Sequence, residues 1–372
     1  MITPKPRLAM VSIGIRRDLL APLDYFSRFE VVHFFRKNVY DDLTAEDLSS
    51  SLRQYRSPID LYQRLVESEP MIIQGVEPFS FYTQPFVWSC VLAARKTRAA
   101  LVIPTFENRP LDVKFGRLRA SVLRRALKNY FDRACLIFAL NNGARENAIQ
   151  CDTPPSKIVR ALWGVWGVDT REFFPRSTRD NNQSPTILFA GRLHKEKGVF
   201  VLLDAFAQLY QVFPTARLRM VGDGPARDEL APQIQARDLT EVVRLSGTIK
   251  HRDMPNVFQN ADIFCAPSLT THKWAEQVGA SSLQAMASGL PIVSTRSGAI
   301  PEYIPDGVAG ILAPENDSHA LATSLLALLR NPQRAREMGA AGRAYACAHY
   351  DARQNVERGE QLLTEYCLAR RV

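Results

Sequence analysis

Short runs of apolar, often β-branched residues alternate with longer helical patterns along all 372 residues, and this alternation restricts the fold more than any other feature. Nearly continuous apolar strands between helices are typical of parallel sheets that are covered on both faces. The first series of expected strands is Leu8–Ile13, Val31–Phe35, Met71–Gln74, Leu101–Thr105, Leu136–Ala139 and Ile158–Leu162. The second series is Thr186–Ala190, Leu218–Gly222, Val242–Leu245, Ile263–Ala266, Ile292–Ser294 and Ile311–Ala313. Two series predict an α/β fold with two doubly wound, Rossmann-like domains.

A polar stretch flanked by proline separates the two series. Residues 175–185 lack hydrophobic periodicity and begin and end with proline, which predicts a linker. We therefore expect an N-terminal domain at 1–174 and a C-terminal domain at 186–350. The last segment, 351–372, has helical spacing and is expected to pack back toward the N-terminal domain. Ligands bind at the carboxyl ends of the strands in such sheets, so we expect the chemistry in a cleft between two facing domains.

Charge and cysteine content restrict the partners and the compartment. Lys and Arg number 47 against 38 Asp and Glu, a net charge of +9 that favours polyanionic partners. No apolar run approaches the roughly 18–20 residues that span a bilayer. Six cysteines are scattered without a C-x-x-C pair, which argues against a disulfide framework or zinc site and fits a reducing cytoplasm.

The sharpest motif follows the first strand of the second domain, from Gly191 to Gly198. Gly191 allows a tight exit from the strand, and Arg192 and Lys197 can project from the loop. Two fixed cations suit a pyrophosphate whose charge grows as a glycosyl or phosphoryl bond breaks. The alternative is a solvated basic loop.

A second motif runs from Glu276 to Pro291 and opens a helix near Ser281. Free backbone amides at a helix start can hold a phosphate. Glu276, just ahead of the helix, can accept hydrogen bonds from sugar hydroxyls, and Gln284 lies one to two turns into it. The alternative is an ordinary capped helix with a glutamate in solvent.

Together with Gly222-Asp223-Gly224-Pro225, these motifs make residues 185–350 resemble the nucleotide-binding domain of retaining glycosyltransferases of family 4 (glycosyl transferases group 1), which have the two-domain GT-B fold. The stretch from Asn141-Asn142 to Gly167-Val168-Asp169, followed by Phe174-Pro175, is similar to the family's approach to its second domain. The resemblance implies transfer of a sugar from a nucleotide-sugar donor to an acceptor hydroxyl of a glycan, glycolipid or small molecule. It leaves the base, the sugar and the acceptor open.

The resemblance also implies roles for individual residues. Arg192 and Lys197 would bind the donor diphosphate and Glu276 would hold sugar hydroxyls. The further donor-binding candidates are Gly14, Gly191, Gly222, Gly279, Ala280, Ser281 and Gln284. Gln284 stands where the family usually has a second Glu that grips the ribose. A neutral acceptor in place of a charged one costs on the order of 1 kcal/mol, about fivefold in affinity.

The first domain offers weaker candidates. Gly14 is the only glycine in the loop expected after the first strand, where a simple turn is an equal alternative. Glu107 and Asn108 end another strand where relatives place a histidine, and they are candidates for the cleft against a capping or turn role. The six histidines show no ligand spacing, so no metal and no cofactor are expected beside the nucleotide-sugar substrate.

Residues Lys114–Arg133 combine helical apolar spacing with seven basic residues. One interpretation is a core-packed helix with a solvated basic face, and the other is a surface that meets anionic lipid. The second would place a cytoplasmic protein at the inner face of the membrane. Nucleic-acid binding is not expected, because no recognised fold or aromatic-basic interleaving accompanies the charge.

Two alternatives to a transferase stay open at this point. Gln284 and the missing histidine are compatible with a nucleotide-sugar-binding protein that has lost transfer activity. A GT-B sugar epimerase would use the same donor site without an acceptor.

Overall fold

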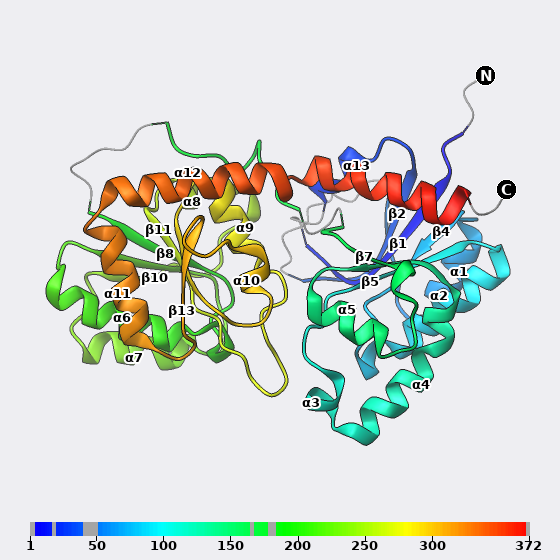
Figure 1. Cartoon of the computed structure of the whole chain (residues 1–372), viewed down its shortest axis with the longest axis horizontal. Coiled ribbons are helices and arrows are strands. Elements are labelled where there is room, and N and C mark those ends of the chain that lie inside the picture. The colour runs from blue at the N-terminus through cyan, green and yellow to red at the C-terminus, as the bar shows by residue number, and fades with distance from the viewer. Residues whose placement is uncertain (1–3, 17–19, 40–50, 164–166, 178–183, 370–372) are drawn as a thin grey trace. The chain divides into compact units, whose positions relative to one another are not determined.

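The structure is a computed structural model that describes residues 4–16, 20–39, 51–163, 167–177 and 184–369. It divides into two compact units (Figure 1). The first unit comprises residues 1–167 and 352–372, and the second comprises residues 168–351. Residues 178–183 of the predicted linker lie outside the described residues.

The first unit is built on a parallel sheet whose described strands follow the order β3-β2-β1-β4-β5-β6-β7. Their bounds are β1 Arg7–Ile15, β2 Glu30–Asn38, β3 Leu52–Gln54, β4 Ile72–Gln74, β5 Ala100–Thr105, β6 Ala134–Ala139 and β7 Ile158–Arg160. The six strands predicted here are confirmed. The sequence did not indicate β3, because its three residues, Leu-Arg-Gln, form no apolar run.

Helices cover one face of this sheet and bury a large core against it. They are α1 Pro58–Glu67, α2 Gln84–Thr97, α3 Leu111–Phe115, α4 Arg117–Arg133 and α5 Asn142–Ile149. Local signals fix their starts: the Ser57 side chain accepts from the Asp60 amide at the start of α1, and Asn141 caps α5 in the same way. Leu61, Val91 and Leu127 come from three of these helices and share one core with Ile73 and Ile103 of the sheet.

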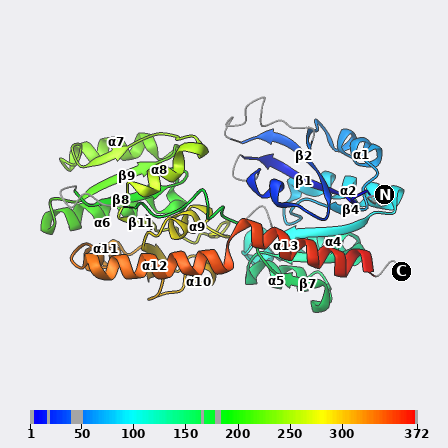
Figure 2. The ribbon, with the colours of Figure 1, turned by 90° about the horizontal axis from the view of Figure 1, so that it is seen from above.

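The C-terminal helix α13, Ala352–Leu363, belongs to the first unit, as the sequence predicted (Figures 1 and 2). The buried Glu360 carboxylate accepts from the Ser27 and Arg28 amides at 3.0 and 2.7 Å and from the Ser27 hydroxyl at 2.9 Å. A side chain at Gly359 would collide with Trp163, so the helix lies directly against this indole. These contacts fix the helix on the sheet face opposite α1 and α2.

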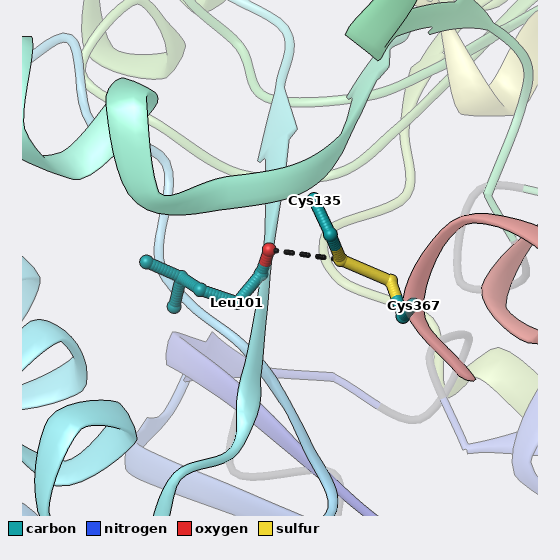
Figure 3. The surroundings of a disulfide bond; sticks show 3 residues. All are labelled: Leu101, Cys135 and Cys367. Atoms are coloured by element: carbon teal, nitrogen blue, oxygen red, sulfur yellow. Dashed lines mark hydrogen bonds between the residues drawn. A yellow bond between two sulfur atoms is a disulfide. The ribbon is translucent and has the colours of Figure 1, made fainter. Parts of the chain in front are cut away.

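A disulfide joins Cys135 of β6 to Cys367, just beyond α13, with the two Cα atoms 5.7 Å apart (Figure 3). The Cys135 sulfur also lies 3.3 Å from the Leu101 carbonyl oxygen, the acceptor that its thiol would use in the reduced protein (Figure 3). The expectation that the scattered cysteines form no disulfide is therefore wrong for this pair. Cysteine spacing indicates only local pairing, and these two residues lie 232 positions apart.

The second unit repeats the same plan with the strand order β10-β9-β8-β11-β12-β13. Its strands are β8 Thr186–Ala190, β9 Arg217–Val221, β10 Val243–Leu245, β11 Ile263–Ala266, β12 Ile292–Thr295 and β13 Gly310–Ala313, and all six were predicted. Its helices are α6 Val199–Val212, α7 Arg227–Ala236, α8 Met254–Gln259, α9 Ala280–Ala287, α10 Ile300–Tyr303, α11 Ser318–Leu329 and α12 Pro332–His349. Figure 1 shows α6 and α7 on one face of the sheet and α8, α9 and α12 on the other.

The boundary between the units falls at Gly167/Val168 and not at the predicted 174/175. Val168 pairs with Asp351 in an isolated parallel bridge. Arg343 of α12 donates to the carbonyls of Thr170 and Phe173 at 2.9 and 2.6 Å. These contacts hold residues 168–174, which precede the polar stretch, in the second unit. The sequence did not indicate them, because they involve residues far away in the chain.

Two other expectations in the first unit need correction. Gly14 lies within β1 and pairs with Lys37, because β1 and β2 stay paired two residues beyond the predicted strand end. The helix predicted at Lys114–Arg133 is interrupted at Gly116, whose φ of 81° separates α3 from α4. Gly116 can adopt this backbone conformation because it has no Cβ.

In both sheets the strand order reverses next to the first strand of the unit. The reversal lies between β1 and β4 in the first unit and between β8 and β11 in the second. Such a switch point is where doubly wound sheets bind ligands, outside the carboxyl ends of the strands.

Candidate functional site

The candidate site in the second unit is formed by the loops that leave the two strands at the switch point, β8 and β11. Lys197 comes from the loop after β8 and Glu276 from the loop after β11. Their side chains meet with Lys197 Nζ 2.6 Å from Glu276 Oε2. The structure therefore brings two of the predicted residues together across 79 positions of sequence.

Glu276 is nearly buried yet held in its charged form. Its side chain is 11% exposed, and its Oε2 also accepts from the Ser268 hydroxyl at 2.7 Å. Burial opposes the charge, but the Lys197 ammonium, the Ser268 hydroxyl and the Gln277 amide all favour it. Together they keep the pKa of Glu276 below its ordinary value. A charged, desolvated carboxylate is a strong acceptor for hydroxyl groups.

Trp274 is a site residue that the sequence analysis missed. Lys197 Nζ lies 4.9 Å from the centroid of the indole, a cation–π contact. The indole is held by its own loop, since the Trp274 amide donates to the Thr271 hydroxyl at 3.0 Å and its carbonyl accepts from the Thr271 amide at 2.7 Å. In the sequence, the one feature that could have indicated a role for Trp274 is its place two positions before Glu276.

Two glycines are required by close backbone approach at this edge of the sheet. Gly198 has φ of 67°, and a Cβ there would lie 1.8 Å from the Pro267 carbonyl oxygen. Gly222 has φ of 126°, and a Cβ there would lie 2.0 Å from the Gly191 carbonyl oxygen. The loop after β8 is thus in direct contact with both the loop after β9 and the loop after β11.

The other predicted donor residues lie in the loop after β8 and in the first turns of α9. Arg192 is exposed, two residues beyond the end of β8. Gly279 caps α9, and Ala280 and Ser281 form its first turn, where amides precede the first intrahelical bonds. Gln284 lies further along α9, with its Nε2 atom 3.4 Å from Nε2 of His251. His251 had no role in the sequence analysis beyond its unsuitable metal spacing.

In the first unit, the Glu107 side chain stabilises a turn, which was the alternative to a position in the cleft. Its carboxylate accepts from the Arg109 amide at 2.9 Å and forms an ion pair with Lys114. Asn108 lies in the same loop, half-buried, with its backbone against Gly143.

Glu77, which follows β4, is a buried carboxyl that the sequence analysis missed. It accepts from the Phe106 amide at 2.7 Å and from the Thr105 hydroxyl at 3.2 Å. Burial, and to a smaller extent the neighbouring Glu107, raise its pKa to about 8 against the bonds that favour its charge. These hydrogen bonds hold the backbone where the chain leaves β5.

No group of three or more His, Cys, Asp or Glu residues in the described part is arranged to hold a metal ion. No helix in these ranges is both long enough and apolar enough to cross a bilayer. A hollow of about 780 Å³ in the second unit is lined by Ile263 and Pro291, which lie at the amino ends of β11 and β12. It is therefore at the opposite edge of the sheet from Lys197 and Glu276.

Comparison with known proteins identifies the second unit. The profile of the family described as glycosyl transferases group 1 matches residues 170–345. A phosphatidyl-myo-inositol mannosyltransferase of Mycobacterium leprae is 33% identical over 235 residues, 63% of this chain and 60% of that protein. A Salmonella typhimurium protein named for glycosyl transfer in colanic acid biosynthesis is 34% identical over 173 residues, 46% of this chain and 42% of its own length. The chain thus spans 42–60% of the length of these curated relatives.

Solved structures extend the likeness to both units. HepE of Anabaena, crystallised with UDP and glucose, superposes with a TM-score of 0.77 at 17% identity over 96% of this chain and 99% of that one. Sucrose-phosphate synthase of Thermosynechococcus elongatus gives a TM-score of 0.72 at 18% identity over 97% and 99%. At this identity the likeness shows the fold, which is the GT-B fold that the sequence predicted. The profile of the glycosyl transferases group 1 family thus covers nearly all of the second unit, and this unit is similar to that family over residues 170–345.

Proposed function

We propose that this protein is a retaining glycosyltransferase that moves a sugar from a nucleotide-sugar donor to an acceptor hydroxyl in glycan, glycolipid or small-molecule glycoside biosynthesis. The observation that carries the proposal is the Lys197–Glu276 pair at the switch point of a family-matched domain. A fixed ammonium beside a charged carboxylate offers one group for a diphosphate and one for sugar hydroxyls.

In the proposed reaction, Arg192 and Lys197 neutralise the negative charge that grows on the departing nucleoside diphosphate. Glu276 accepts hydrogen bonds from the sugar and fixes its orientation while the anomeric carbon passes through an oxocarbenium-like state. The backbone amides at the start of α9 hold a phosphate. No bound metal is required in this scheme, because side-chain cations supply the positive charge, and addition of EDTA is expected to leave turnover unchanged.

The decisive experiment begins with a donor screen. UDP-, GDP-, ADP- and TDP-sugars are tested for thermal stabilisation, and the stabilising donor is then used in turnover assays. Arg192→Ala and Lys197→Ala should each lower kcat by roughly 10²–10³ if a preorganised charge contact is lost. Lys195→Ala is the matched control, because Lys195 is a lysine of the same loop that is 67% exposed and pairs with Glu229 on the surface. Near-normal turnover in the two test variants would refute the assignment.

The same assay separates the alternatives. Donor binding without turnover across a broad panel of acceptors would indicate a binding protein that has lost activity. A new sugar nucleotide formed from donor alone would indicate an epimerase.

A lipid surface is the second element of the proposal, and helix α4 carries it. At 100° per residue, Leu118 and Val122 point away from the buried Leu127, and they are 80% and 56% exposed. Arg119 and Arg125 are exposed on either side of this apolar ridge. Exposed aliphatic residues flanked by arginines are complementary to an anionic bilayer, at the cytoplasmic face in this proposal. Two relatives are named as mannosyltransferases of phosphatidylinositol compounds, which is compatible with such a location.

Sedimentation with liposomes tests this element separately. The protein should bind vesicles that contain anionic lipid and not neutral ones, and Arg119→Glu should weaken binding at least about fivefold. Leu118→Ser should also weaken it, whereas Ile59→Ser, at an exposed position of α1, serves as the control. Equal sedimentation of all variants would exclude α4 as the contact.

A further inference from the structure

His251 occupies a central position between three separate segments of the second unit. It lies between β10 and α8, with Gln284 of α9 on one side and Glu172 on the other. Its Nε2 is 3.4 Å from Gln284 Nε2, and its Nδ1 is 3.9 Å from Glu172 Oε1. The Phe173 ring packs edge-on against the imidazole with centroids 5.7 Å apart, which limits rotation of the ring.

The contact with Gln284 corresponds to one arrangement of protons on the imidazole. A neutral histidine has one donor and one acceptor nitrogen. The amide nitrogen of Gln284 lies at Nε2 and donates to it, so the imidazole proton is on Nδ1, the nitrogen on the side of Glu172. With its nitrogen directed at His251, the amide of Gln284 turns its oxygen away from the imidazole.

This orientation matters because an amide, unlike a carboxylate, has only one acceptor atom. A glutamate at position 284 would present an acceptor oxygen in either orientation of its end group. A glutamine presents an acceptor only when its oxygen faces the ligand, and an unrestrained amide would spend part of its time with the NH₂ group there.

We propose that His251 is a positioning residue that holds the Gln284 amide with its oxygen toward the ribose hydroxyls of the donor nucleotide. The inference rests on the proposed function, and it deepens it by explaining how a neutral side chain serves at a position that binds a polyol. Glu172 and Phe173 lie against the ring of His251 and keep it in place.

Binding of UDP, GDP and ADP, measured by calorimetry with the full chain, tests the proposal. With the nucleotide that binds wild type, His251→Ala should raise Kd about 3- to 10-fold. Gln284→Glu should restore affinity in the His251→Ala background, because a carboxylate needs no orientation. The 2′,3′-dideoxy form of the same nucleotide should bind wild type and His251→Ala equally, since it lacks the hydroxyls that the oxygen would contact.

Each outcome is informative. An equal loss of affinity from His251→Ala with Gln284 and with Gln284→Glu would mean that His251 only supports the local fold, and would overturn the inference. Unchanged affinity in His251→Ala would overturn it as well, while the proposed function would stand. If wild type binds none of the nucleotides, both proposals fail. Thermal midpoints of the free variants show whether each one folds.

Discussion

Two buried glutamates, one in each unit, are held in opposite states. Burial raises the pKa of Glu77 in the first unit to about 8, whereas the pKa of Glu276 in the second unit stays below its ordinary value. Burial is the largest influence on both, and it favours the neutral form. The difference is the partner: Glu276 has the Lys197 ammonium at 2.6 Å, and the largest charged influence on Glu77 is another carboxylate, Glu107. The candidate site of the second unit therefore keeps a buried charge, whereas in the first unit a buried neutral carboxyl bonds to the loop after β5.

The surfaces differ as well. Of the thirteen large apolar side chains that are exposed among the described residues, ten lie in the first unit and three in the second. The first unit also contains the disulfide between Cys135 and Cys367. The first unit thus contains the disulfide and most of the exposed large apolar side chains of the described residues, whereas the candidate site of the second unit is built around a charged pair.

The largest expected effect concerns the covalent link in the first unit. Cys367→Ser should lower the free energy of unfolding of this unit by about 2–5 kcal/mol in the oxidised protein, because the disulfide closes a long loop in the unfolded chain. Cys347→Ser, at a half-buried cysteine of the second unit that is not part of this disulfide, is the control. Guanidinium unfolding with and without dithiothreitol measures the effect. Identical stability of Cys367→Ser and wild type under oxidising conditions would show that the bond does not form.

Without the Lys197 ammonium, the pKa of Glu276 should rise, as burial raises the pKa of Glu77. Lys197→Met removes the cation beside the buried Glu276 carboxylate and should destabilise the second unit by about 3 kcal/mol at neutral pH. The double variant Lys197→Met/Glu276→Gln should recover most of this loss, since no buried charge then remains. Chemical denaturation of the two variants beside Lys195→Met gives the comparison, and no recovery in the double variant would contradict the argument.

Glu77, the neutral carboxyl of the first unit, predicts that the stability of this unit depends on pH with the opposite sign to that expected from a carboxylate paired with a cation. Because the folded pKa of Glu77 is about 8 and the unfolded value is near 4.5, the folded protein binds more protons between these pH values. Its stability should therefore fall as pH rises from about 5 to 8, by about 1–3 kcal/mol. Hydrogen exchange of β4 and β5 amides measures this slope. Glu77→Gln should flatten it, and an unchanged slope in that variant would assign the effect to another group.

A smaller effect of the other sign is expected from His33 of β2. Burial lowers its pKa to about 4, and its Nε2 lies 2.9 Å from the Ser12 hydroxyl. The unfolded chain therefore takes up the proton first as pH falls. Stability of the first unit should decrease by about 1–2 kcal/mol between about pH 6.5 and 4. His33→Gln should remove this decrease in hydrogen exchange of β1 and β2 amides, and persistence of the decrease would point to other groups.

Local sequence patterns predicted the elements well and the boundaries less well. All twelve predicted strands are present, because a buried parallel strand needs an apolar run whatever its neighbours are. The strand β3 was missed, since its short polar sequence is held by pairing with β2 and not by an apolar pattern. The break at Gly116 was missed for the related reason that apolar spacing continues across it.

For the candidate site, the motifs placed Lys197 and Glu276 at the ends of the correct strands, and the fold made those strands neighbours. The sequence did not indicate that the two side chains pair with each other. Trp274 and His251 belong to no motif that the sequence analysis used, and their positions follow from loops that meet only in the folded unit.

The sequence by itself determined the alternation of strands and helices, the family resemblance of the second unit and the loops that carry its charge. Periodicity and motif spacing are properties of residues close together in the sequence, so they can be recognised without knowledge of the fold. The tertiary structure alone decided which distant groups meet: Lys197 with Glu276, Cys135 with Cys367, and Glu360 with Ser27. It also decided which carboxyl keeps its charge, because burial and the distance to a cation are set only when the strands have taken their order in the sheet.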